Sequence, residues 1–266
     1  MSNTINYKNE IQIYQQMKPY FYNSDDIKIN DTLINDLITE FELKRKKYIF
    51  KIGVDYEPYP SIENERKITR QVINLINTYG HYLAIHTSSN LVLRDLDLIK
   101  KINKVSVFIN VSLNDNVAKI IEPNSSTINE KIDVIKKIKN NNIPVFVIIK
   151  PVFSKINDSL EDLKSILSQL AECNIDGIIK PTFSINIKEN EKKYLLEKIT
   201  KEFPMLKREY SKLLKNNEII SQFQKYLTDY FIKFCNNKNI LFNEEDIYKL
   251  AYELDEEKSY EQISLF

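Results

Sequence analysis

The chain has 266 residues, and its 38 Lys and Arg residues nearly balance its 37 Asp and Glu residues. This balance provides no global field that would attract nucleic acid or a membrane surface. The three glycines, Gly53, Gly80 and Gly177, are too few and too far apart for a P-loop or a dinucleotide-binding glycine loop. Two cysteines, with no apolar run of signal-peptide or membrane-spanning length, predict a soluble protein of the reducing cytoplasm.

Short apolar runs alternate with longer segments of helical period, a pattern typical of βα units around a parallel sheet. We expect strands at 48–54, 82–87, 105–112, 144–150 and 177–183. We expect helices at 66–78, 92–103, 128–141 and 160–173. Each of the last two has a plain apolar stripe, which would cover the outside of the sheet. After Phe183 the pattern becomes Lys- and Glu-rich helices through Leu254, with only a weak strand signal at 240–242.

The two faces of the expected strands differ in polarity. In the strand at 105–112, Ser106, Phe108, Asn110 and Ser112 alternate with an entirely aliphatic set. In a parallel barrel the aliphatic set meets the helices, the other set lines the interior, and function lies at the carboxyl ends of the strands. One mouth would then be surrounded by Asp55, Glu57, His86, Ser88, Asn110, Ser112, Lys150 and Lys180. The alternative is that these are solvated strand ends without a function.

Several motifs at these strand ends resemble the spore photoproduct lyase-like branch of the radical S-adenosylmethionine superfamily. The segment from Gly53 to Glu63 resembles its G-x-x-T-D-P-Y-Q-P-x-E, and residues 68–70 match its L-T-R. Residues 87–97 resemble T-K-S-x-L-V-L-R-D-x-D, and later segments match E-P at 122–123, A-P at 150–151 and L-N-D-S at 156–159. The resemblance covers about Asp31 to Asn186 and implies an α/β fold, a partial (β/α)6 TIM-like parallel barrel.

The resemblance also implies a division of the chain and a cofactor pocket. Residues 1–30 would hold the remnant of the cluster loop, 31–186 the barrel, 187–254 a helical extension and 255–266 a flexible tail. Residues at the strand ends of this family are expected to contact S-adenosylmethionine. The candidates here are Asp55, Glu57, Tyr59, Ser88, Asn110, Ser112, Lys150 and Lys180. Ser88 replaces the family's Lys, Tyr56 its Thr and Pro60 its Gln, so we expect the pocket to have changed.

The chain departs from the family most clearly at the iron-sulfur cluster. The loop C-x-x-x-C-x-Y-C-Y would align with residues 14–22, which puts Tyr14, Lys18 and Phe21 at the cysteine positions. A [4Fe-4S] cluster is therefore not expected, since its irons need thiolate ligands. Cys173 and Cys235 lie in apolar helical contexts and are predicted to be buried. His86 with Asp55 and Glu57 would be an alternative metal site, although we expect none.

The last five residues resemble the Q-L-S/D-L-F peptide by which bacterial repair and replication proteins dock on the sliding clamp. Leu265 and Phe266 would fill an apolar pocket, and Gln262 would fix the register. The alternative is that Leu265 and Phe266 pack on the protein's own surface.

Three functional classes remain open on the sequence. The first, which we favour, is a cluster-free barrel acting as a binding or accessory protein in nucleic-acid metabolism. The second is an enzyme with a repurposed mouth that uses Lys150, Lys180, His86 and two carboxylates. The third is an active radical enzyme whose cysteine loop is absent from this chain.

Overall fold

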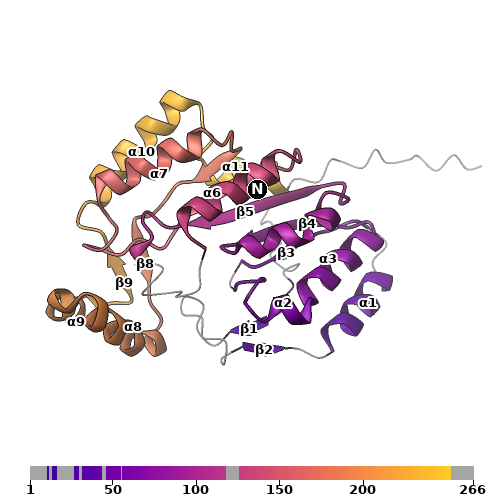
Figure 1. The fold of residues 1–266 in the computed structure, drawn as a ribbon, viewed down its shortest axis with the longest axis horizontal. Helices are drawn as coiled ribbons and strands as arrows, with labels where there is room; N and C mark the ends of the chain where they lie inside the picture. Colours follow the sequence, from indigo (N-terminus) through magenta and orange to yellow (C-terminus); the bar gives the residue numbers. More distant parts are fainter. Residues whose placement is uncertain are drawn as a thin grey trace, which may run out of the picture.

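A five-stranded parallel sheet forms the centre of the computed structural model (Figure 1). The structure describes residues 11, 14–16, 27–29, 32–43, 46–54, 56–117 and 126–252. The strands are β3 (Ile49–Ile52), β4 (Tyr82–Thr87), β5 (Val105–Val111), β6 (Val145–Ile149) and β7 (Gly177–Ile179), and each lies next to its successor in the chain. This sequential parallel order is that of a TIM-like barrel, as the sequence predicted.

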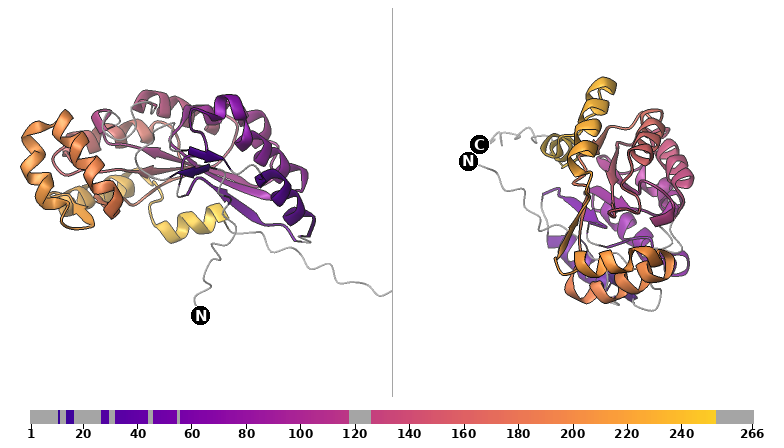
Figure 2. Two further views of the ribbon diagram at one scale, coloured as in Figure 1. Left: turned by 90° about the horizontal axis from the view of Figure 1, so that it is seen from below. Right: turned by 90° about the vertical axis from the view of Figure 1, so that its left-hand side faces the viewer.

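Helices between the strands cover the outer face of the sheet (Figure 2). They are α3 (Ile68–Thr78), the 3-10 turn η3 (Asn90–Asp95) with α4 (Leu96–Ile99), α6 (Ile128–Lys139) and α7 (Leu160–Ala171). The predicted apolar stripes are the buried ones, as Ile132, Ile135 and Ile138 of α6 illustrate. Thr127 and Glu130 begin α6 with a capping box. The helix expected at 92–103 is instead a 3-10 turn followed by one short helix.

The backbone of Ile11 is hydrogen-bonded to the edge strand β3 and to the loop that follows it. The Ile11 N–H donates to the Lys51 carbonyl at 2.9 Å, and the Tyr56 hydroxyl donates to the Ile11 carbonyl. Farther along, β1 (Tyr14–Gln16) pairs antiparallel with β2 (Ile27–Ile29). The helix α1 (Leu33–Leu43) then buries Leu33, Leu37 and Phe41 in the main core. The sheet of the described residues has five strands, so the sixth strand of the expected (β/α)6 barrel stays a prediction.

Beyond β7 the chain builds a lobe that the sequence pattern did not fully predict. The lobe contains β8 (Ser184–Asn186), α8 (Glu189–Glu202), the 3-10 turn η4 (Pro204–Leu206), α9 (Lys207–Leu213) and β9 (Glu218–Ile220). The expectation that 240–242 would be the only strand after β7 was wrong, since β8 pairs antiparallel with β9 and 240–242 is not a strand. The lobe has its own core, in which Leu195, Ile199 and Tyr210 pack with Phe153.

The two last helices lie on opposite faces of the sheet. The helix α10 (Gln224–Lys238) packs against α7 in the outer layer and buries Leu227 and Phe231 there. The helix α11 (Glu244–Tyr252) lies across the inner face, as the left view of Figure 2 shows. Its approach needs a glycine in β7, because a Cβ on Gly177 would lie 2.9 Å from the Leu241 carbonyl oxygen. Within the described residues, no helix has the length and apolarity that a bilayer crossing requires.

Candidate functional site

The inner face of the sheet carries the residues that the alternation predicted. The register pairs His86 of β4 with Phe108 of β5, and Phe108 with Phe146 of β6. One level closer to the strand ends, Asn110 pairs with Ile148. Because alternate strand residues share a face, these residues form two successive levels of the barrel interior.

The lower of these levels is covered by α11, which the sequence did not predict. Phe108, Phe146 and Ile179 form a buried cluster with Ile247 and Ala251 of α11. The side chains that α11 buries on the inner face are therefore mostly apolar, and His86 and Lys51 are polar residues that also contact this helix, through Tyr252. Further polar residues of the inner face lie at the carboxyl ends of the strands.

Glu57 joins two of the strand ends. Its carboxylate accepts hydrogen bonds from the Tyr59 N–H at 3.0 Å, the Thr87 hydroxyl at 2.5 Å, and the N–H and hydroxyl of Ser88, both at 2.8 Å. Burial raises the pKa of Glu57, and the hydrogen bonds from Thr87, Ser88 and Tyr59 oppose this effect. The structure thus brings together two predicted site residues, Glu57 and Ser88, and adds Thr87, which the sequence analysis had not singled out.

Asn110, Ser112 and Lys150 lie on the next two strands. The Lys150 N–H donates to the Val111 carbonyl at 3.1 Å, which sets Lys150 beside the end of β5. The Oδ1 atom of Asn110 is buried and has no hydrogen-bond partner among the described residues. A buried acceptor without a donor is costly, so it indicates a place for a hydrogen-bonding ligand or water.

Two predicted site residues stand apart from this group. Lys180 is exposed and directly follows Ile179, whose side chain faces α11, so Lys180 alternates away from the interior. Asp55 lies outside the described residues. Across the described ranges, no three His, Cys, Asp or Glu side chains are grouped as a metal site requires. A metal role for His86 with Asp55 and Glu57 has no support in these ranges.

His86 is a buried, neutral imidazole. Its ring stacks on Phe108 with centroids 4.2 Å apart, and its Nε2 lies 2.9 Å from the Tyr252 hydroxyl. Burial, followed by the nearby charges of Lys150 and Lys51, lowers the pKa of His86 to about 3. The His86 ring is therefore uncharged at neutral pH. The ammonium group of Lys51 lies near this part of the interior, since its Nζ is 4.3 Å from the centroid of the Tyr252 ring.

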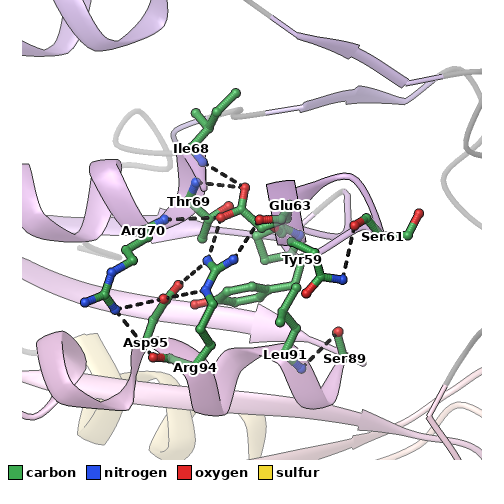
Figure 3. Close-up of polar contacts among 12 residues, drawn as sticks. Tyr59, Ser61, Glu63, Ile68, Thr69, Arg70, Ser89, Leu91, Arg94 and Asp95 are labelled. Atoms are coloured by element: carbon green, nitrogen blue, oxygen red, sulfur yellow. Dashed lines mark hydrogen bonds and ion pairs between the residues drawn. The ribbon is translucent and has the colours of Figure 1, made fainter. Parts of the chain in front are cut away.

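A second group of motif residues forms an ion network that joins the start of α3 to the turn after β4 (Figure 3). The Glu63 carboxylate accepts from the Ile68 and Thr69 N–H groups at 2.9 and 3.1 Å, which satisfies the start of α3. The Arg94 guanidinium reaches Glu63 at 2.7 Å and Asp95 at 2.8 Å. Both carboxylate side chains have 0% exposure, so Arg94 forms ion pairs with two fully buried groups.

Arg70 and Tyr59 complete the network. Arg70 binds Asp95 at 3.1 Å and forms a bidentate pair with Asp97 at 2.8 Å, which lowers the pKa of Asp97 to about 2. Tyr59 is buried beside these groups, and burial followed by the nearby Asp95 carboxylate raises its pKa well above the ordinary value. The Tyr59 hydroxyl has no hydrogen-bond partner within the described ranges. A cofactor contact for Tyr59 stays a prediction.

The network gives a physical role to the motifs that carry the family resemblance. Glu63, the segment Ile68-Thr69-Arg70 and the R-D-x-D at 94–97 hold one another by ion pairs and hydrogen bonds. The sequence indicated these residues as motifs, but their contact with one another was not predicted. A signal for this contact was present in the sequence, because the three motifs carry complementary charges. These are at Glu63, Arg70, Arg94, Asp95 and Asp97.

Both cysteines are buried in the outer helix layer, as predicted. Cys173 follows α7, and Cys235 lies in α10, which packs on α7. Burial raises the pKa of both thiols, that of Cys235 to about 12.

Of the three presumed cluster positions, Tyr14 belongs to β1, whereas Lys18 and Phe21 lie outside the described residues. The predicted clamp-binding residues Gln262, Leu265 and Phe266 also lie outside the described residues.

No family model matches the chain. An uncharacterized protein of Methanocaldococcus jannaschii is 34% identical over 124 residues, which make up 46% of this chain and 46% of that protein. An uncharacterized protein of Acidianus two-tailed virus is 29% identical over 152 residues, 54% of this chain and 50% of that protein. An uncharacterized protein of Mycobacterium bovis is 23% identical over 183 residues, 66% of this chain and 53% of that protein. The chain spans about half the length of the curated relatives it matches.

Two solved structures share the architecture. A variant of spore photoproduct lyase superposes with a TM-score of 0.54 at 12% identity, over 73% of this chain and 60% of that chain. Streptococcus suis SuiB bound to the precursor peptide SuiA gives a TM-score of 0.54 at 13% identity, over 88% of this chain and 48% of that chain. At such low identity the likeness shows the fold alone. The chain therefore has the fold of the radical S-adenosylmethionine barrels.

Replacing Arg94 tests the ion network. In Arg94→Met the carboxylates of Glu63 and Asp95 stay buried without their cation, so we expect the free energy of unfolding to fall by about 3–5 kcal/mol. The control is Lys155→Met, which breaks the ion pair with Glu209, where the two side chains are 38% and 34% exposed. That change should cost less than about 1 kcal/mol. Urea unfolding measures both, and equal losses in the two variants would contradict a central role for Arg94.

The neutral state of His86 predicts a pH-dependent stability. Its pKa is about 3 in the folded protein and 6.5 in the unfolded chain. Between these two pKa values only the unfolded chain gains the additional proton on His86. The stabilisation that comes from the uncharged folded state of His86 is therefore complete above pH 6.5 and is lost as the pH falls. From pH 7 to pH 5 the free energy of unfolding should fall by about 2 kcal/mol more than in His86→Gln. Urea unfolding of both proteins at each pH gives the difference, which would be zero if His86 were solvated.

Proposed function

We propose that this chain is a binding protein built on a radical S-adenosylmethionine-type barrel that works without a [4Fe-4S] cluster of its own. The placement of the two thiols carries the proposal. Cys173 and Cys235 are buried in the outer helix layer, whereas a cluster of this type would need three thiolates on one loop. The pKa of each thiol is raised, which disfavours the thiolate form. The donor set of the chain does not fit the cluster.

We place the ligand at the polar mouth above α11. Asn110 Oδ1 supplies a buried acceptor, and Lys150, two residues beyond the Ile148 that pairs with Asn110, supplies a cation at the end of the next strand. S-adenosylmethionine fits these groups in kind, because its amino group or ribose hydroxyls would donate to Asn110 and its carboxylate would pair with Lys150. Ser88 and Ser112 would add hydroxyl groups at the rim.

The link to nucleic-acid metabolism has a more indirect basis. One of the fold neighbours, a spore photoproduct lyase variant with a TM-score of 0.50, was solved with bound AdoMet and a dinucleoside spore photoproduct. The second support is the predicted clamp-binding peptide at Gln262 to Phe266. Acid–base catalysis at the mouth is a weaker candidate, because Glu57 accepts four hydrogen bonds and His86 is neutral and bonded to Tyr252.

Anaerobic reconstitution followed by a titration tests the proposal. After incubation with iron and sulfide we expect no stoichiometric iron and, with S-adenosylmethionine and a reductant, no 5′-deoxyadenosine. Calorimetry should instead detect binding of intact S-adenosylmethionine. Lys150→Met should weaken it by about tenfold, the equivalent of roughly 1.4 kcal/mol, as expected for loss of a charge-assisted hydrogen bond.

The matched control is Lys101→Met, since Lys101 is exposed in the turn that precedes β5, at the opposite end of the strands. It should leave the affinity unchanged. A stoichiometric cluster that cleaves S-adenosylmethionine would overturn the cluster-free function. If Lys150→Met and the unaltered chain bound S-adenosylmethionine with equal affinity, the mouth would not be the binding site.

Docking on a bacterial sliding clamp stays a prediction. We expect the full chain to bind the clamp modestly, since ordering a peptide costs free energy that two apolar anchors only partly offset. Leu265→Ala with Phe266→Ala should abolish binding, while Lys258→Ala should change it little. A titration of clamp with these variants and with a chain ending at Glu261 measures the effect. Equal affinity with and without residues 262–266 would end the clamp hypothesis.

A further inference from the structure

Tyr252, in the last turn of α11, contacts the inner face of the sheet in three ways. Lys51 Nζ lies 4.3 Å from the centroid of its ring. The ring stacks on Phe108 with centroids 5.7 Å apart and 29° between the planes. Its hydroxyl lies 2.9 Å from His86 Nε2. A cation, an aromatic plane and a hydrogen-bonding nitrogen are the groups that recognise an aromatic ring with a polar substituent.

The three groups opposite Tyr252 belong to the rigid part of the fold. Lys51, His86 and Phe108 lie on β3, β4 and β5, and their exposed fractions are 7%, 5% and 0%. The His86 and Phe108 rings are parallel within 2°, and Phe108 stacks in turn on Phe146 at 5.1 Å. Their backbone positions are therefore set by the strands of the sheet and not by α11.

Tyr252 itself belongs to a less stable element. The helix α11 has nine residues, and a helix of this length is stable only through its packing. The Tyr252 side chain is half-buried, unlike Lys51, His86 and Phe108. The buried residues of α11 are Ile247 and Ala251, and short peripheral elements open before the core strands do. Tyr252 is thus the partner in this group that another ring can replace.

We propose that Lys51, His86 and Phe108 form a binding site for an aromatic ring that carries a hydroxyl or comparable hydrogen-bonding group, and that Tyr252 is its intramolecular occupant. The ligand class is a phenol or a nucleobase-sized heteroaromatic ring. A ligand of this class binds by displacing Tyr252 and the end of α11. This site lies one level deeper in the barrel than Asn110, so it does not depend on the mouth binding S-adenosylmethionine.

The proposal is tested by deleting the Tyr252 ring and measuring whether p-cresol binds in its place. In the full chain, Tyr252→Ala should bind p-cresol about tenfold more tightly than the unaltered protein does, because the probe replaces the missing side chain without competition. Toluene, which lacks the hydroxyl, should bind the same variant about fivefold less tightly than p-cresol. Adding His86→Leu should remove this preference for p-cresol. Calorimetry measures each affinity.

The control is Tyr226→Ala, which deletes a 58% exposed tyrosine on α10 and should create no p-cresol site. If Tyr252→Ala does not fold, Tyr252→Phe provides a second test. It keeps the ring and loses only the bond to His86, so p-cresol should compete about fivefold better than in the unaltered chain, and the amides of α11 should exchange hydrogen faster. No gain in p-cresol affinity in a folded Tyr252 variant, or equal binding of p-cresol and toluene, would show that Tyr252 is only a packing residue.

Discussion

The contact between Arg94 and two buried carboxylates is the constraint on which the candidate site depends. Glu63 and Asp95 have fully buried side chains, and a buried charge is tolerated only when it is paired and hydrogen-bonded. Arg94 supplies the charge, while the first amides of α3 satisfy the rest of Glu63. These contacts fix the loop between β3 and α3 against the turn after β4. Because Glu57 lies on this loop and bonds Ser88 at the end of β4, the network also sets the geometry of one side of the mouth.

The barrel interior is divided into two levels with different chemistry. Near the strand ends, Asn110 and Lys150 offer hydrogen-bonding and charged groups. Below them, α11 lies against Phe108 and Phe146, and this level is largely apolar. Tyr252 brings a polar contact into the lower level through His86. A ligand that enters from the mouth would therefore meet α11 as the floor of its site, and the position of α11 would decide how deep the site is.

The fold of this chain does not by itself determine its chemistry. The likeness to spore photoproduct lyase and SuiB concerns the arrangement of strands and helices, and one fold supports many functions. The motifs with the clearest family resemblance, at 63, 68–70 and 94–97, are engaged here in the ion network. Their resemblance is therefore informative about the fold and says little about catalysis. The cysteines lie on the outer helices, away from the strand ends where the reaction of a parallel barrel takes place.

The sequence by itself determined the sheet and the helices outside it, because side-chain alternation and helical periodicity are local properties. It placed Asn110 and Lys150 on adjacent strand ends, since parallel strands in sequential order present their carboxyl ends at one edge. Only the tertiary structure decided what covers the inner face. The apolar stripe of α11 looks like that of any surface helix, and nothing local tells which face of the sheet it joins. The same holds for β8 and β9, whose pairing spans 32 residues from Asn186 to Glu218, and for Arg94 meeting Glu63, because contacts between distant segments are set by the packing of the whole chain.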